Sequence, residues 1–251
     1  MQPLQRGNIR LAATILLIRQ GGGGPEVFMM KRPGGVDFPD LHVFPGGKVD
    51  EADFAPELVS GLSPAAADRL LGIEAGGLRY WVAAIRECFE ECGVLLAYRD
   101  GGLIRWAGED EIERFNGYRQ QLIDGELGML EVCRRENIRL AADRVLYFSH
   151  WITPEQAPRR FDTRFFIAAM PDDQRTIAHA WETADDEWVR PRDALAAHAD
   201  GRWQMISPTL TTLASIADHP DVPSILDTVL AEEHLVELTD ALRAQGMHAL
   251  R

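Results

Sequence analysis

The segment R-E-C-F-E-E-C-G-V, residues 86–94, combines an apolar stripe with three closely spaced glutamates. At about 100° per residue, Glu87, Glu90 and Glu91 fall on one helix face, within an arc of about 100°. The opposite face carries apolar residues at the 3-4-3 spacing of a buried stripe. These are Val82, Ile85, Cys88, Phe89 and Cys92. Because like charges three and four residues apart repel by roughly 0.2–0.5 kcal/mol per pair, the acidic face is costly without a cation.

Two interpretations fit this acidic face. The pattern E-x-x-E-E alone favours a solvated surface, since such patterns are common on acidic proteins. Three clustered carboxylates also suit a hard divalent cation, Mg²⁺ or Mn²⁺, which would reverse the repulsion. In either case Gly93 is expected to end the helix, because glycine readily adopts the left-handed cap conformation.

A glycine pair upstream favours the metal interpretation. The run Phe44-Pro45-Gly46-Gly47 predicts the end of a strand followed by a turn that glycines follow easily. Such a turn offers the bare carbonyl of Gly46 to a metal. It also lets a phosphate approach the backbone at Gly47.

Together, the two segments resemble a split Nudix box, the signature G-x5-E-x7-R-E-U-x-E-E-x-G-U of the Nudix hydrolases. Gly47 matches the opening glycine, and residues 86–94 match the second half. Asp53 stands where the family has glutamate, which shortens the reach of an expected ion pair with Arg86. Residues 54–85 number 32 where the usual box has 7. The resemblance spans roughly residues 9–195.

The resemblance implies an α/β fold, the Nudix-type α/β/α sandwich with a mixed sheet. It implies a Mg²⁺- or Mn²⁺-dependent hydrolase and no organic cofactor. The metal would be held by Glu87, Glu90, Glu91 and the Gly46 carbonyl, while Arg86 orients the glutamates.

A further acidic residue is implied in a loop near the end of the resemblance. Many Nudix proteins place a glutamate there as metal ligand or general base, and Glu182 matches it best by position. Asp185, Asp186 and Glu187 are competitors, and a solvated acidic loop is the alternative. The general base is therefore Glu182 or one of the helix glutamates.

Two arginines in the run of residues 158–166 are candidates for phosphate binding. Arg160 and Arg164 share one face of an extended segment with Asp162 between them. Their guanidinium groups could bind phosphates bidentately, or they could form a solvated Arg-Asp-Arg ladder. Arg32, after the second strand, and Gly47 are further substrate-contact candidates.

The long interruption resembles one branch of the family, the long-insert Nudix proteins that include peroxisomal coenzyme A diphosphatases. Further matches are V-F-P-G-G-x-x-D-x-x-D and the run of residues 151–166, W-I-T-P-E-Q-A-P-R-R-F-D-T-R-F-F. This resemblance implies cleavage of coenzyme A or acyl-CoA to 3′,5′-ADP and (acyl)phosphopantetheine. The alternatives are an ADP-ribose or NADH pyrophosphatase and a non-catalytic Nudix domain that senses a nucleotide.

The expected organisation is a Nudix domain over residues 1–205, with an insert at 54–80 and a helical excursion at 109–137. Residues 206–251 are expected to form a helical extension that packs on the same domain. Ser63 followed by Pro64 predicts the start of a helix inside the insert. Residues 11–18 and 27–31 predict a β-hairpin.

Composition limits the partners. The formal net charge of −13 argues against nucleic acids and anionic membranes, because phosphate polymers would be repelled. The expected partner is a small nucleoside diphosphate derivative, and a homodimer is left open. Cys88, Cys92 and Cys133 show no disulfide or zinc pattern, and no apolar stretch approaches membrane-spanning length. These features predict a cytoplasmic protein.

Overall fold

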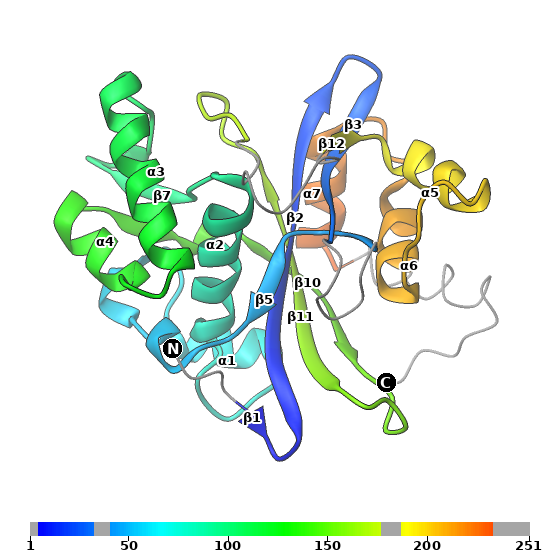
Figure 1. The fold of residues 1–251 in the computed structure, drawn as a ribbon, viewed down its shortest axis with the longest axis horizontal. Helices are drawn as coiled ribbons and strands as arrows, with labels where there is room; N and C mark the ends of the chain where they lie inside the picture. The colour runs from blue at the N-terminus through cyan, green and yellow to red at the C-terminus, as the bar shows by residue number, and fades with distance from the viewer. Residues whose placement is uncertain (1–4, 33–40, 177–186, 233–251) are drawn as a thin grey trace. The chain divides into compact units, whose positions relative to one another are not determined.

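The computed structural model describes residues 5–32, 41–176 and 187–232, and the chain divides into two compact units (Figure 1). Among the described residues, the first unit comprises 5–15 and 46–176. The second comprises 16–32, 41–45 and 187–232. The long strand β2, Ile9–Gly21, contributes residues to both units. The domain boundary expected at residue 205 stays a prediction.

The main sheet brings β5 and β11 beside the N-terminal part of β2. Strand β10, Leu146–Ile152, pairs with β11, Arg160–Ala169, which borders β2. The short strand β5, Gly46–Lys48, pairs with β2 so that Thr14 lies opposite Gly46. The two-residue strand β1 also pairs with β2. The pairing of β5 with β2 holds the glycine segment against the sheet.

A second, smaller sheet lies in the same unit. Its strands follow the order β6, β9, β7, β8, and the β6–β9 pair is parallel. The strands are β6 (Val59–Ser60), β9 (Arg139–Ala141), β7 (Ala97–Arg99) and β8 (Gly102–Leu103). The insert that interrupts the box therefore pairs with a strand about 80 residues further along the chain.

The insert contains the predicted helix. Helix α1 spans Pro64–Leu71, and the Ser63 hydroxyl accepts a hydrogen bond from the Ala66 N–H at 3.2 Å. The acidic helix α2, Leu78–Cys92, follows and ends at Gly93, whose φ is 72°. The predicted N-terminal cap and left-handed C-terminal cap are both confirmed.

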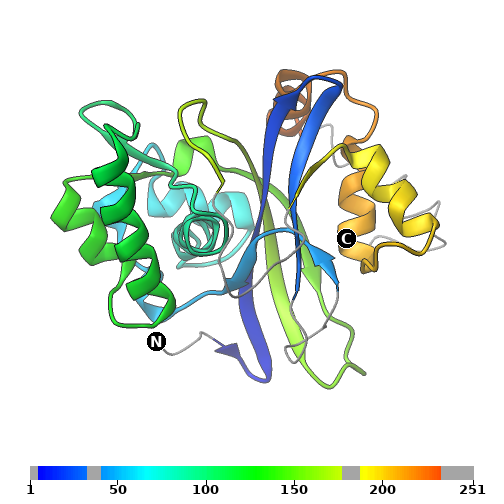
Figure 2. The ribbon, with the colours of Figure 1, turned by 45° about the horizontal axis from the view of Figure 1, so that its top comes forward.

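Helix α2 is enclosed on most of its surface. All five residues of its predicted apolar stripe are buried. On the sheet side, Trp81 packs edge-on against Phe166 at 4.8 Å between ring centres and donates to the Val145 carbonyl at 2.8 Å. Figure 2 looks nearly down the axis of α2 and shows the sheet on one side and α3 on the other. The helix is thereby fixed in both direction and rotation.

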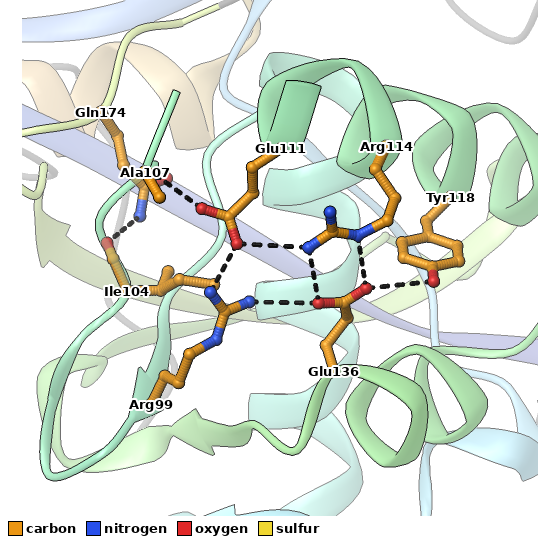
Figure 3. Close-up of polar contacts among 8 residues, drawn as sticks. All are labelled: Arg99, Ile104, Ala107, Glu111, Arg114, Tyr118, Glu136 and Gln174. Atoms are coloured by element: carbon orange, nitrogen blue, oxygen red, sulfur yellow. Dashed lines mark hydrogen bonds and ion pairs between the residues drawn. The ribbon is translucent and has the colours of Figure 1, made fainter. Parts of the chain in front are cut away.

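The excursion at 109–137 forms α3, Glu109–Ile123, and α4, Met129–Glu136. An ion-pair network joins the two helices to β7 (Figure 3). Glu136 accepts from Arg114, Arg99 and the Tyr118 hydroxyl. Glu111 accepts from Arg99 and from the Ala107 N–H. The side chains of both glutamates are about nine-tenths buried, so the network ties the excursion to the sheet.

This network predicts a loss of stability in acid. The hydrogen bond from Arg114 lowers the pKa of Glu136, against an opposing effect of burial. Burial raises the pKa of Glu111, but the bonds from Ala107 and Arg99 outweigh it and lower the pKa overall. A lowered folded-state pKa contributes stability above the unfolded value near 4.5 and loses it as the pH falls further. We expect Glu136→Gln to flatten the decline of the free energy of unfolding between pH 5 and pH 3, measured by urea titration. An unchanged pH profile would contradict this.

The second unit contains the hairpin partner of β2 and the C-terminal helices. Strand β3, Gly24–Lys31, pairs with β2 through the tight turn at residues 22–23, as predicted. Strand β12 (Glu187–Val189) pairs with the outer side of β3, and β4 (His42–Val43) pairs with its end. The helices are α5 (Pro191–Ala199), α6 (Ser207–Ile216) and α7 (Val222–Leu230). Figure 1 shows α5 beside α6.

The mixed sheets and flanking helices confirm the predicted α/β class. Over the residues that the structure describes, no helix is both long and apolar enough to cross a membrane. The three cysteines are free and buried, as expected. Cys88 and Cys92 approach to 3.5 Å between their sulfur atoms without forming a disulfide.

Candidate active site

The two halves of the split motif meet in space. The Gly46 N–H donates to the Glu91 carboxylate at 2.6 Å, across 45 positions of the chain. The Arg86 guanidinium donates to the Lys48 carbonyl at 2.8 Å. The long insert therefore leaves the motif and returns to it, as expected.

Arg86 is the centre of the assembled motif. It is 3% exposed and forms two hydrogen bonds to Asp53, at 2.9 and 3.0 Å. It also donates to Glu87 at 2.7 Å and to Glu90 at 3.2 Å. The predicted Arg86–Asp53 ion pair is confirmed. The shorter aspartate reaches Arg86 because it lies in a 3₁₀ turn, Glu51–Asp53, where it also accepts from the Asp50 N–H at 2.8 Å.

The acidic face of α2 is not a solvated surface. The side chains of Glu87 and Glu90 are each only 12% exposed. Burial raises the pKa of Glu90 to about 8, with Arg86 opposing the shift and Glu87 adding to it. Burial likewise raises the pKa of Glu87. Carboxylates held in this way are unfavourable as anions unless more positive charge is supplied.

One cation inside the motif does not balance its carboxylates. Arg86 contacts Asp53, Glu87 and Glu90, which is one positive charge facing three acids. Glu90 Oε1 is buried and has no hydrogen-bond partner among the described residues. An uncompensated buried oxygen beside two other carboxylates is the donor set that a hard divalent cation needs. The residues present therefore fit a Mg²⁺ or Mn²⁺ ion.

The carboxylates do not converge on one point as they stand. Within the described parts of the chain, no three acidic, histidine or cysteine side chains are placed to hold an ion together. Glu87 and Glu90 turn toward Arg86, and Glu91 turns toward the Gly46 N–H. Since these contacts engage carboxyl groups at the ends of flexible side chains, rotation about the side-chain bonds would be enough to redirect them.

The prediction of a turn at Gly46-Gly47 is wrong. Both glycines lie in β5 and pair with β2. They are needed for close approach rather than for a turn. A Cβ on Gly47 would lie 2.4 Å from the Glu87 carboxylate, and a Cβ on Gly46 would lie 2.6 Å from the Ala13 carbonyl. Strand β5 thus fits between β2 and the Glu87 side chain only because both positions lack a Cβ.

Alanine at each of the two glycines should have a different effect, one on activity and the other on stability. Gly47→Ala should push the Glu87 carboxylate aside, because that group is the mobile end of a side chain, and should reduce activity about 10-fold or more. Its melting temperature should change little. Gly46→Ala should instead lower the stability, by about 1–3 kcal/mol, because its Cβ meets rigid backbone. Kinetics and thermal unfolding of both variants test this, and equal losses of stability would contradict it.

The arginines of β11 occupy different environments. Arg164 is 6% exposed and Asp162 is 1% exposed, so the solvated-ladder alternative is wrong for these two residues. Arg164 donates to the Tyr147 hydroxyl at 3.1 Å, and Asp162 binds His150 at 2.6 Å. Arg160 is half-buried and donates to the Thr153 carbonyl at 3.1 Å. Their predicted role in phosphate binding stays a prediction.

Other predicted site residues lie in different parts of the chain. Arg32 is in the second unit, where its backbone N–H donates to the Leu41 carbonyl at 2.9 Å. Glu182, Asp185 and Asp186 lie outside the described residues. Glu187 is the first residue of β12.

One buried residue beside the acidic helix was missed by sequence reasoning. Arg119 of α3 donates to the backbone carbonyls of Glu90 and Glu91 at 2.8 and 2.9 Å. No motif marks it, because it belongs to the helical excursion and acts on backbone atoms. Only its position on a helix with a buried side could have suggested a partner.

The fold and the assembled motif together define a Nudix-type hydrolase. A solved Nudix hydrolase from Alicyclobacillus acidocaldarius has a similar fold, with a TM-score of 0.72 and 23% identity. The similarity covers 88% of this chain and 96% of that one.

Comparison of the sequence identifies the family. The model of the NUDT19 Nudix domain matches residues 75–216, more than half of the 251-residue chain. The chain belongs to the NUDT19 group of Nudix hydrolases, which confirms the resemblance found in the split motif.

Curated relatives show modest identity. The acyl-coenzyme A diphosphatase NUDT19 of Gallus gallus is 26% identical over 69% of this chain, and that of Xenopus laevis is 23% identical over 68%. The protein provisionally named nudix hydrolase 7 of Caenorhabditis elegans is 26% identical over 83%. The matches span 61%, 54% and 62% of these relatives' lengths, respectively.

Proposed function

We propose that this enzyme hydrolyses the diphosphate bond of a nucleoside diphosphate linked to another moiety, with Mg²⁺ or Mn²⁺ as cofactor. The observation that carries the proposal is the buried carboxylate cluster around Arg86. Glu90 in particular has a raised pKa and a buried oxygen without a partner among the described residues. Such a cluster is unfavourable by itself and becomes favourable when a divalent cation joins it.

The metal would be held by Glu87, Glu90, Glu91 and the carbonyl of Gly46. When bound, a divalent ion neutralises the diphosphate and lowers the pKa of a coordinated water. Arg86 keeps the carboxylates in place through its paired contacts with Asp53 and its bond to the Lys48 carbonyl. The substrate phosphates would approach the backbone at Gly47, where no side chain intervenes.

The chain must also accept a proton. Attack of water on phosphorus forms one P–O bond and breaks the bridging P–O bond, and the proton of the water passes to a carboxylate. Glu182 or one of the helix glutamates is the proposed acceptor.

The proposed substrate is coenzyme A or acyl-CoA, cleaved to 3′,5′-ADP and (acyl)phosphopantetheine. Support comes from two relatives named acyl-coenzyme A diphosphatase, which the chain matches over part of their lengths. Arg160 and Arg164, with Arg32, are the proposed contacts of the substrate phosphates. ADP-ribose and NADH are the alternative substrates. A nucleotide sensor without activity is less favoured, because the Arg86–carboxylate cluster is intact.

A substrate panel tests the proposal. The protein is incubated with Mg²⁺ or Mn²⁺ and with CoA, acyl-CoA, NADH, ADP-ribose or dNTPs, and the products are identified by mass. Formation of 3′,5′-ADP from CoA or acyl-CoA supports the proposed substrate. Turnover of ADP-ribose or NADH with CoA untouched would replace it. Binding without turnover across the panel would indicate a sensor.

A further inference from the structure

Arg119 joins the helical excursion to the end of the acidic helix. It lies on α3 and is 4% exposed. Its Nε donates to the Glu90 carbonyl at 2.8 Å, and its Nη2 donates to the Glu91 carbonyl at 2.9 Å. A planar guanidinium can hold two adjacent acceptors at once, so the contact fixes both position and orientation.

These two carbonyls belong to the last turn of α2, where the helix cannot supply its own donors. The Gly93 N–H bonds to the Phe89 carbonyl and closes the helix there. The Leu95 N–H, which would serve the Glu91 carbonyl in a continued helix, donates instead to Gln174 at 2.9 Å. Arg119 therefore takes the place of the missing helical donors.

The charge of Arg119 also suits this place. The C-terminal end of a helix carries partial negative charge, and Glu87, Glu90 and Glu91 add more. A cation at the backbone side of the turn offsets part of this charge without occupying the carboxylates. Arg86 and Arg119 thus act on opposite sides of the same turn, one on side chains and the other on backbone atoms.

We propose that Arg119 is a positioning residue, which holds the backbone of Glu90 and Glu91 so that their carboxylates can bind the divalent metal. The inference rests on the proposed function, because it assumes that these glutamates are metal ligands. The network of Figure 3 supports it, since it anchors α3 to α4 and β7 through Glu111 and Glu136. A firmly held α3 lets Arg119 act as a fixed support.

Direct metal binding separates this role from general packing. Mn²⁺ is titrated into the protein, and the free ion is followed by its electron paramagnetic resonance signal. The variants are Arg119→Gln, Arg119→Lys and Arg114→Gln. The last is the matched control, because Arg114 lies on the same helix but forms its ion pairs with Glu111 and Glu136. Thermal unfolding is recorded for each variant.

Arg119→Gln should raise the Kd for Mn²⁺ by about 10- to 100-fold, as loss of an outer-shell partner does in other metal sites. Arg119→Lys keeps the charge but not the paired geometry and should give an intermediate Kd. The kcat of Arg119→Gln should recover partly at high Mn²⁺, with KM for the nucleotide nearly unchanged. Arg114→Gln should bind Mn²⁺ like the wild type even where its melting temperature falls, because Arg99 still bridges Glu111 and Glu136 and keeps α3 in place.

Two results would overturn the inference while leaving the proposed function in place. One is a wild-type Kd for Mn²⁺ in Arg119→Gln. The other is an equal rise in Kd in Arg114→Gln, which would show that loosening of the excursion is sufficient. If the wild-type protein itself does not bind Mn²⁺, the proposed metal site fails and the inference fails with it.

Discussion

Glu90→Gln is expected to lower kcat/KM by about a thousandfold, which corresponds to about 4 kcal/mol of transition-state stabilisation. Glu90 accepts a hydrogen bond from Arg86, and its buried Oε1 has no partner among the described residues. A glutamine has the same shape but only one neutral oxygen for a metal. Steady-state kinetics at saturating Mg²⁺ and Mn²⁺ measure the effect.

The fold should survive this change. Glu90 carries a carboxyl whose pKa is raised to about 8 by burial, so removal of its charge should not lower the melting temperature in metal-free buffer. Glu131→Gln is the matched control, because Glu131 is an exposed helical glutamate paired with Arg135. The control should keep wild-type kinetics. Wild-type kinetics in Glu90→Gln would show that the assignment of metal ligands is wrong.

Arg86→Met is expected to produce the largest loss of stability, about 3–5 kcal/mol at pH 7. The arginine is 3% exposed, and its loss leaves the carboxylates of Asp53, Glu87 and Glu90 buried without their cation. The free energy of unfolding from urea titration measures the loss. Arg135→Met, which breaks an exposed pair with Glu131, should cost about 0.5 kcal/mol or less.

The pH dependence of Arg86→Met gives a second test. Without Arg86, the folded-state pKa values of Glu87 and Glu90 should rise further above their ordinary value of 4.5, because Arg86 opposes the effect of burial on both. Groups raised in this way contribute stability below the unfolded pKa and lose it as the pH rises. The deficit relative to wild type should therefore shrink between pH 7 and pH 5. A second substitution, Asp53→Asn, should lower the free energy of unfolding less in the Arg86→Met variant than in the wild type. A deficit that is constant with pH, together with additive effects, would contradict the ion-pair account.

Local sequence signals were sufficient for the helices α1 and α2. The apolar stripe from Val82 to Cys92 and the glycine at position 93 predicted α2 and its end. Ser63 and Pro64 predicted α1. These signals are dependable because helix periodicity and capping act within a few residues.

Other features depend on distant parts of the chain. The strands β6, β7 and β9 are two or three residues long and pair with partners more than 40 residues away, so no local pattern marks them. Gly46 and Gly47 form a strand although glycine disfavours strands, and neither position has room for a Cβ, which would meet β2 at Gly46 and the Glu87 carboxylate at Gly47. The meeting of the two halves of the motif was expected only from the family resemblance.

Burial was the property least accessible from the sequence. Asp162 and Arg164 are two residues apart on a strand, the spacing of charged residues on a solvated face, yet both are buried. Arg119 resembles any arginine of a surface helix, and only the folded chain shows it at the carbonyls of Glu90 and Glu91. Side-chain pattern reports which residues share a face, while tertiary packing decides what that face meets.

The central claim is that the acidic end of α2 holds a divalent cation beside β5. Anomalous diffraction from a crystal of the protein grown with Mn²⁺ tests this directly. We predict a manganese peak coordinated by carboxylate oxygens of Glu87, Glu90 and Glu91, with the Gly46 carbonyl nearby. Arg86 should remain paired with Asp53. A protein active with Mn²⁺ whose crystal shows the ion bound elsewhere, and no peak among these glutamates, would contradict the account.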